Sequence, residues 1–305
     1  MSDLPEIKNS KSKNAGTLYI VPTPIGNLQD ITERARIALL EATTIAAEDT
    51  RRCRKLLQLL DIPEVNPSPR IVPLHEHNEA GAVDGLVARL VQGETVALVS
   101  DAGTPLISDP GHLLLRGVWA AVDAGCAIQI VPLPGPSAVS TALSGCPLPL
   151  HLFTFAGFLP AKESPRQARI GELLSLPGAF VLFEAPHRIE ATLLDLAQLI
   201  GSRRVFVARE LTKLHEQLLL GSARSVLEQL EVADALRGEF VIVVEGPTAS
   251  ATGIGVATTI GVETLLFALA EELSPSQASK VAAKLTGARR SDLYNLLQAR
   301  NTGES

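Results

Sequence analysis

Four loops rich in glycine, proline and small polar residues each follow a short apolar run of the chain. They are PTPIGN at 22–27, AEDTR at 47–51, SDAGTP at 100–105 and PLPGPSA at 132–138. Gly103, Gly135 and Ser137 allow a ligand to approach the main chain closely. The Asp101 carboxylate is able to accept hydrogen bonds from an amine or a ribose. Each loop alone can be a plain turn, but together they predict a pocket of backbone groups, small side chains and one or two carboxylates.

Other kinds of site lack their sequence signatures. The loop at 22–27 has no GxGxxG fingerprint and the chain has no GxxxxGK[ST] motif, which argues against dinucleotide and P-loop nucleotide sites. The three cysteines are scattered, without the spacing of metal ligands, and indicate a reducing compartment. His75 and His77 have no Cys or Asp partner at ligand spacing. We therefore expect a pocket without a metal.

The elements that carry these loops follow from the pattern of apolar runs. The pattern predicts strands at 17–21, 43–47, 95–99 and 127–131, and helices at 30–42, 83–91 and 113–123. Asp30 and Glu33 stand at capping-box spacing at the start of the first helix. Apolar strands separated by amphipathic helices imply a mostly parallel sheet covered on both faces. Ligands of such sheets bind beyond the carboxyl ends of the strands, where the four loops lie.

A second part of the chain has a different rhythm. After residue 149, strands are predicted at 153–158, 179–183, 204–209, 216–220 and 239–244. Few helices intervene and hairpin-like pairing is expected, so this part reads as a second α/β domain with a mixed sheet. Three short helices follow at 263–273, 275–285 and 291–298.

The predicted organisation of the whole chain is therefore two α/β domains and a small helical module. Its parts are a disordered tail at 1–15, an N-terminal α/β domain at 16–132, a C-terminal α/β domain at 133–246, a linker at 247–259 and a helix-turn-helix-like module at 260–305. A plain helical cap is the alternative for the last part.

Composition limits the classes of partner. The 305 residues include 27 basic and 33 acidic side chains, and aromatic residues make up only 4%. A general polyanion binder is usually basic, so any contact with nucleic acid must be local. No apolar run approaches the roughly 18 residues of a membrane span, and the first fifteen residues have no signal-peptide core. We expect a cytoplasmic protein that contacts no membrane.

Ordered blocks of sequence carry a resemblance to a known family. The blocks are TLYIVPTPIGNLQDITERA, AAEDTR, LHEHNE, LVSDAGTPLISDPG, VPLPGPSA, GFLPAK and ARELTKLHE. Over residues 16–246 the chain resembles the ribosomal RNA small subunit methyltransferase I family of the tetrapyrrole methylase superfamily. Pro22 and Pro24 stand where other members of the superfamily often have glycines.

This resemblance implies a fold, an activity and partners. It implies two α/β domains with S-adenosylmethionine in the cleft between them, commonly in a homodimer. The implied reaction is methylation of a cytidine 2′-hydroxyl in the decoding region of 16S ribosomal RNA, presented as RNA or as the small ribosomal subunit. The alternatives are a tetrapyrrole (precorrin-type) or diphthine methyltransferase of the same fold, and a donor-binding or ribosome-assembly protein without catalysis.

The resemblance also implies residue roles. The methyl donor is expected to contact Pro24, Ile25, Asp101, Gly103, Thr104, Ser137, Ala138, Phe183 and Leu211. Local basic residues are expected to contact RNA, namely Arg51, Arg52, Arg54, Lys55, Lys162, Arg166, Arg188, Arg289 and Arg290. A solvated helix face is the alternative explanation of these charges.

A ribose hydroxyl reacts readily only after losing its proton, so a general base is expected. The candidates are Glu48, Asp49, His75, His77, Glu184 and Glu210. Their place in AAEDTR favours Glu48 or Asp49. The two histidines can instead cap helices or bond to the backbone, and Glu210 can instead form an ion pair.

Overall fold

The computed structural model describes residues 15–62, 69–247 and 262–302. By its internal contacts the chain divides into two compact units, Met1–Pro247 and Thr248–Ser305. The expected tail at 1–15 and linker at 247–259 lie outside the described residues, except for residues 15 and 247. Each unit is described by itself.

The first sheet of the larger unit is entirely parallel. Its strands are β1 (Gly16–Val21), β2 (Thr44–Ala47), β3 (Arg70–Pro73), β4 (Thr95–Val99) and β5 (Ile128–Pro132). They lie in the order β3-β2-β4-β1-β5. Because the strands are parallel, the loops that follow β1, β2, β4 and β5 all leave from one edge of the sheet.

Helices cover both faces of this sheet. They are α1 (Glu33–Glu41), α2 (Thr50–Leu59), α3 (Glu79–Val91) and α4 (His112–Asp123). Side chains alternate across a strand, so β1 contributes to two cores. Val21 packs in the core that contains Leu39 of α1, whereas Leu18 packs in the core that contains Leu90 of α3. The predicted parallel sheet with two covered faces is confirmed.

Several local features of the first sheet and its helices differ from the expectation: α2 was not among the expected helices, and α3 begins at Glu79 instead of 83. β3 is a half-exposed edge strand that ends in a proline, so it has no continuous apolar run to mark it. The helix expected at 30–42 begins later, because Ile31 is extended and Thr32 caps α1 by accepting the Ala35 N–H at 3.1 Å. The residues before it form a short 3₁₀ helix, Leu28–Asp30.

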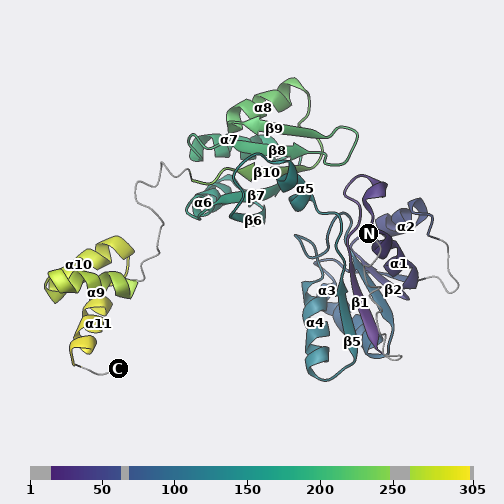
Figure 1. The fold of residues 1–305 in the computed structure, drawn as a ribbon, viewed down its shortest axis with the longest axis horizontal. Coiled ribbons are helices and arrows are strands. Elements are labelled where there is room, and N and C mark those ends of the chain that lie inside the picture. The colour runs from purple at the N-terminus through teal and green to yellow at the C-terminus, as the bar shows by residue number, and fades with distance from the viewer. Residues whose placement is uncertain (1–14, 63–68, 248–261, 303–305) are drawn as a thin grey trace, which may run out of the picture. The chain divides into compact units, whose positions relative to one another are not determined.

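The second sheet is mixed, as predicted. Its strands are β6 (Phe153–Phe158), β7 (Ala179–Glu184), β8 (Val205–Arg209), β9 (Gln217–Gly221) and β10 (Phe240–Val244). They lie in the order β6-β7-β10-β8-β9; β6 and β7 are parallel and every other pair is antiparallel (Figure 1).

One face of the second sheet forms a core with three helices, α6 (Glu163–Leu174), α7 (Ile189–Leu199) and α8 (Ala223–Val232). The other face packs with α5 (Ala138–Gly145) and with Ile25 from the loop after β1. A Cβ at Gly26 would overlap the side chains of Lys213 and Thr212, so this loop lies directly against the loop after β8. The two sheets therefore share one compact unit, and we keep the domain boundary near residue 132 as a proposal.

In its described residues, 262–302, the smaller unit contains three helices, α9 (Val262–Glu272), α10 (Pro275–Thr286) and α11 (Arg290–Thr302). Ser274 and Gln277 form a capping box at the start of α10. Gly287 ends this helix with φ of 73°, a conformation that glycine adopts without strain. Leu266, Ala282 and other small apolar side chains form a separate core. Across the ranges that the structure describes, no helix is long and apolar enough to cross a membrane.

Candidate active site

A cavity of about 430 Å³ lies between the carboxyl edge of the first sheet and strands β7, β8 and β10 of the second. This volume is in the range of about 300–1,000 Å³ found for small-molecule sites. Eight of the nine residues expected to contact the methyl donor line it: Ile25, Asp101, Gly103, Thr104, Ser137, Ala138, Phe183 and Leu211. The ninth, Pro24, is not among the lining residues. The chain thus brings the expected set together from five separate segments.

The loop after β4 is pinned to its neighbours. Thr23 and Gly103 exchange two backbone hydrogen bonds of 2.9 Å. The Thr104 hydroxyl donates to the Pro136 carbonyl at 2.9 Å, and the Ser100 hydroxyl approaches the Gly103 carbonyl at 3.2 Å. The polar residues after the buried strand therefore join three loops into one wall of the cavity.

Strained backbone gathers on two loops that border the cavity. Leu106 and Ser108 have φ of 74° and 69°, and Glu210 and Thr212 have φ of 51° and 66°. Such conformations cost a non-glycine residue on the order of 1–3 kcal/mol and are concentrated at functional sites. Of these four residues Ser108 lines the cavity, and Leu211, which stands between Glu210 and Thr212, lines it as well.

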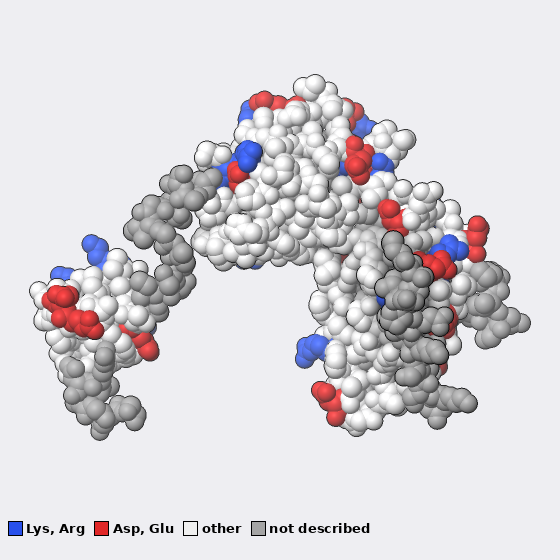
Figure 2. All heavy atoms as spheres, in the orientation of Figure 1, with Lys and Arg blue, Asp and Glu red and all other residues white. Residues whose placement is uncertain are grey.

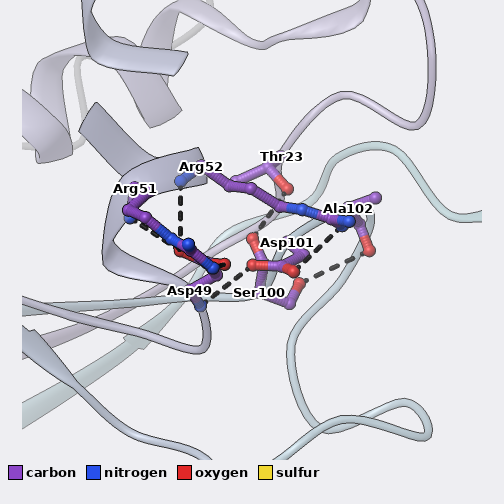
Figure 3. A network of polar contacts seen from close by, with 7 residues as sticks. All are labelled: Thr23, Asp49, Arg51, Arg52, Ser100, Asp101 and Ala102. Carbon is purple, nitrogen blue, oxygen red and sulfur yellow. Dashed lines mark hydrogen bonds and ion pairs between the residues drawn. The ribbon is translucent and has the colours of Figure 1, made fainter. Parts of the chain in front are cut away.

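Three carboxylates, Glu48, Asp101 and Asp109, line one end of the cavity. Asp101 is fully engaged: its Oδ1 accepts the Asp49 N–H at 3.0 Å, and its Oδ2 lies 3.1 Å from Arg52 Nη1 (Figure 3). The Asp101 carboxylate therefore holds the start of α2 against the loop after β4.

The other two carboxylates have raised pKa values. Burial raises the pKa of Glu48, and the charge of Asp101 adds to the rise, against an opposing hydrogen bond from the Asp101 N–H and the charge of Arg52. Burial, followed by the charges of Glu48 and Asp101, raises the pKa of Asp109 to about 6, although the Ser100 hydroxyl donates to it. Asp109 is therefore placed to exchange protons near pH 6, and the pKa of Glu48 shifts in the same direction.

Asp109 was not among the expected site residues. It stands in SDPG, where an aspartate before Pro-Gly reads as an ordinary turn residue. The signal that could have found it is its position as the tenth residue of the long polar block that follows β4.

Asp49, the second favoured base, has a different position. It is the N-cap of α2, where its Oδ1 accepts the Arg51 N–H at 2.7 Å and its carboxylate pairs with the Arg51 guanidinium at 2.9 Å. The hydrogen bond from the Arg51 side chain holds the pKa of Asp49 well below its usual range. Asp49 does not line the cavity, so of the two favoured residues only Glu48 faces it.

The remaining base candidates have structural partners or lie elsewhere. Glu184 lines the cavity but accepts the Thr192 hydroxyl at 2.6 Å and pairs with Arg188. Glu210 pairs with Lys213 at 2.7 Å, the alternative left open by the sequence. His75 and His77 form an edge-on ring pair with centroids 6.1 Å apart and do not line the cavity.

The residues expected to contact RNA fall into two groups. Arg51, Arg52, Arg54, Lys55, Lys162, Arg289 and Arg290 are exposed. On the face shown in Figure 2, basic groups lie beside acidic ones rather than in one broad field, as the local contact predicted from composition requires.

Arg166 and Arg188 do not belong with the exposed group. Arg166 is buried, with its Nε 2.6 Å from Asp195 Oδ2, and its Nη1 donates to the Ala161 carbonyl. Arg188 is largely buried and donates to the Leu159 carbonyl. We correct the expectation for both: burial takes these guanidinium groups away from solvent, and they fix the segment that carries GFLPAK instead.

The described ranges hold no group of three or more His, Cys, Asp or Glu side chains arranged to bind a metal ion. The cavity is lined instead by carboxylates, backbone groups and apolar side chains.

Comparison with known proteins assigns the family. Residues 17–227 match the model of the Tetrapyrrole (Corrin/Porphyrin) Methylases, and residues 257–301 match the RsmI C-terminal HTH domain. Diphthine synthase has the same fold with a TM-score of 0.56, 16% identity and coverage of 76% of this chain and 90% of that one. The methyltransferase CobJ superimposes with a TM-score of 0.55, 19% identity and coverage of 76% and 95%.

Sequence relatives are more specific than these structures. The Ribosomal RNA small subunit methyltransferase I of Xylella fastidiosa is 46% identical over 281 residues, or 92% of this chain and 98% of that protein. The protein of the same name from Escherichia coli O157:H7 is 41% identical over 287 residues, or 93% and 96%. With this identity along almost its whole length, and with both family models matched, the chain belongs to the ribosomal RNA small subunit methyltransferase I family of the tetrapyrrole methylases.

Proposed function

We propose that this protein transfers a methyl group from S-adenosylmethionine to the 2′-hydroxyl of a cytidine ribose in the decoding region of 16S ribosomal RNA. The observation that carries the proposal is the cavity, whose lining combines carboxylates with apolar side chains. The names of relatives at 41–46% identity support an acceptor in the small ribosomal subunit.

The residues of the cavity fit the methyl donor. Ile25, Phe183 and Leu211 offer apolar surfaces for an adenine ring. Gly103, with φ of 84°, lets a ligand approach the main chain where a side chain would be strained. The carboxylates are complementary to the positive charge of a sulfonium and an ammonium group. When bound, S-adenosylmethionine supplies a methyl carbon that is electrophilic because its sulfur carries a positive charge.

The chain's own residues would do two things for the acceptor. The pinned loops hold the ribose against the cavity, and positioning of this kind removes a large part of an entropic barrier. A cavity carboxylate takes the hydroxyl proton, so that the ribose oxygen becomes a nucleophile. Glu48 and Asp109 both line the cavity, and we withdraw Asp49 because its carboxylate caps α2.

The exposed basic residues of α2 support contact with RNA. Arg51, Arg52, Arg54 and Lys55 project from the helix whose first turn borders the cavity, and Arg52 itself lines it. Phosphate contacts would position the RNA without reading its sequence. Arg289 and Arg290, in the smaller unit, are further candidates. Family membership supports a homodimer that acts in the cytoplasm.

The test is transfer of label to its natural acceptor. Purified protein is incubated with methyl-labelled S-adenosylmethionine and hypomethylated small ribosomal subunits, and the label is mapped after nuclease digestion. We expect one labelled cytidine 2′-oxygen in the decoding region. Absence of label, with the donor still bound in calorimetry, would overturn the RNA acceptor and direct the search to tetrapyrrole and protein acceptors.

A further inference from the structure

The three cavity carboxylates differ in what surrounds them. Asp101 has both oxygens occupied, by the Asp49 N–H and by Arg52. Glu48 feels the charge of Arg52 and accepts the Asp101 N–H. Asp109 has a hydroxyl donor, Ser100, and two carboxylate neighbours, and none of the groups that perturb it is a cation. Its negative charge is therefore the least compensated of the three.

The backbone around Asp109 is fixed by its neighbours. Ser108 is in the left-handed region at φ 69°, and Pro110 disfavours the α region for the residue before it, Asp109. Gly111 has φ of 123°, and a Cβ there would overlap the side chains of Leu98 and Leu106. Asp109 thus lies in the wall of the cavity between a strained residue, Ser108, and a position, Gly111, at which only glycine fits.

The ordinary structural role for an aspartate at this position is already filled. Asp109 lies just before α4, where a carboxylate commonly caps the helix. The N-cap residue, Gly111, has no side-chain hydrogen bond to offer. Glu79 of α3 accepts instead, with Oε1 2.7 Å from the Leu113 N and 3.2 Å from the Leu114 N. Asp109 is therefore not needed to complete the helix.

We propose that Asp109 is the general base of the methyl transfer, and that Glu48 is a positioning residue whose negative charge keeps Asp109 a strong proton acceptor. This inference rests on the proposed function and names the group that would touch the acceptor hydroxyl. The O–H proton passes to Asp109, and its bonding electron pair remains on the ribose oxygen. That oxygen gains the methyl group as the sulfonium becomes a thioether, and the carboxylic acid then releases its proton to water.

Proton transfer of this kind is most efficient when the pKa of the base lies near the working pH. Burial and the neighbouring charges of Glu48 and Asp101 raise the pKa of Asp109 to about 6. Arg52 also lines the cavity, as do Glu184 at the end of β7 and Glu239 just before β10. Because Glu48 and Asp109 interact, their apparent pKa values belong to the pair and not to either residue alone. The pH dependence of the rate therefore reports the titration of the pair.

The experiment compares single-turnover methyl transfer to small ribosomal subunits by the wild type and by Asp109→Asn, between pH 5 and 8. Donor and subunits are saturating, and donor affinity is measured by calorimetry. Asp123→Asn, an exposed change at the far end of α4, is the matched control. A conservative Asp109→Glu variant keeps the carboxylate and tests for rescue.

We expect the wild-type rate to fall about tenfold per pH unit below a pH of about 6 and to level off above it. Asp109→Asn should lower the rate by about 10²- to 10⁴-fold and abolish this pH dependence. The donor Kd should change less than threefold, Asp109→Glu should regain part of the rate with a pH-dependent limb, and Asp123→Asn should behave as wild type. Carbon NMR of protein labelled at its aspartate carboxyls should show a group that titrates near pH 6 and disappears in Asp109→Asn.

Other outcomes would overturn the inference. An Asp109→Asn rate within threefold of wild type, with the same pH limb, removes Asp109 from the role. Loss of the limb in Glu48→Gln but not in Asp109→Asn would make Glu48 the base. Weaker donor binding with an unchanged pH profile would make Asp109 a donor contact. A wild type that labels no ribosomal RNA overturns the proposed function itself, whereas a labelled wild type with an active Asp109→Asn overturns this inference alone.

Discussion

Two groups of inward-facing carboxylates differ in how the fold treats their charge. In the second sheet's helices, Asp195 is buried against Arg166 at 2.6 Å and accepts the Gln167 amide at 2.8 Å. At the cavity end of the first sheet, Glu48 and Asp109 repel each other and lie beside Asp101. The first arrangement satisfies every charge and holds a segment in place. The second leaves charge partly uncompensated, which destabilises the fold locally and is useful to chemistry.

The largest expected effect comes from breaking the satisfied arrangement. Asp195→Asn would leave the buried Arg166 guanidinium without its counter-charge. Removing one partner of a buried ion pair costs about 3–5 kcal/mol in free energy of unfolding. Urea denaturation of the purified variant should show this loss as a lower midpoint with an unchanged slope.

The double variant Arg166→Met/Asp195→Leu is the matched control. Replacing both charges with apolar side chains of similar volume is often neutral for stability, so most of the lost free energy should return. If the double variant is no more stable than Asp195→Asn, packing around these side chains matters more than their charges.

A smaller effect is expected from the exposed charges of α2. Arg51→Gln/Arg54→Gln/Lys55→Gln removes three cations while leaving Arg52 on Asp101. If each contacts a phosphate, the slope of log affinity against log salt should become shallower by about 2–3 for the three contacts together. Subunit binding measured between 50 and 200 mM salt checks this. Arg224→Gln, at an exposed position of α8, is the control, and an equal slope in both variants would assign the α2 charges to a solvated face.

A further effect concerns stability and pH. The folded-state pKa of Asp109, about 6, lies above the ordinary value of 3.8 for an aspartate. Between these two pH values the Asp109 carboxyl holds its proton in the folded state and loses it in the unfolded chain. The contribution of Asp109 to the free energy of unfolding is therefore fully present below pH 4 and is lost as the pH rises through 6. After solvent screening we expect Asp109→Asn to be more stable than wild type by about 1 kcal/mol at pH 8.

Thermal unfolding at pH 4 and pH 8 measures that difference. The gain of Asp109→Asn over wild type should be larger at pH 8 than at pH 4. If Asp109→Asn is less stable than wild type at pH 8, the Asp109 carboxylate stabilises the fold, as the Asp195 carboxylate does.

The sequence predicted much of the frame and less of the site. Apolar strands such as β4 and β10 were predictable because they are buried on both faces and read as continuous runs. β3 was not, because it is a half-exposed edge strand. Gly103 and Ser137 were predictable because their loops carry local backbone signals.

Charge pairing across long separations is where sequence reasoning failed. Arg166 meets Asp195 across 29 positions, so its burial cannot be read from its neighbours in the chain. Asp109 is freed for chemistry because Glu79, 34 positions before Leu113, caps α4. Glu48 and Asp49 are adjacent, yet the turn into α2 sends one carboxylate to the cavity and the other to the helix. Such roles are decided by tertiary contacts and not by residue type.

The smallest effect separates those two adjacent residues. Because Asn is as good an N-cap as Asp, Asp49→Asn should retain the cap of α2 and lose little stability, whereas Asp49→Ala should lose about 1 kcal/mol. Neither should change the pH dependence of methyl transfer, since Asp49 does not line the cavity. Urea denaturation and the single-turnover profile together check both halves. Loss of the pH limb in Asp49→Asn, with the cap intact, would return Asp49 to the role of base and show that the helix start opens when substrate binds.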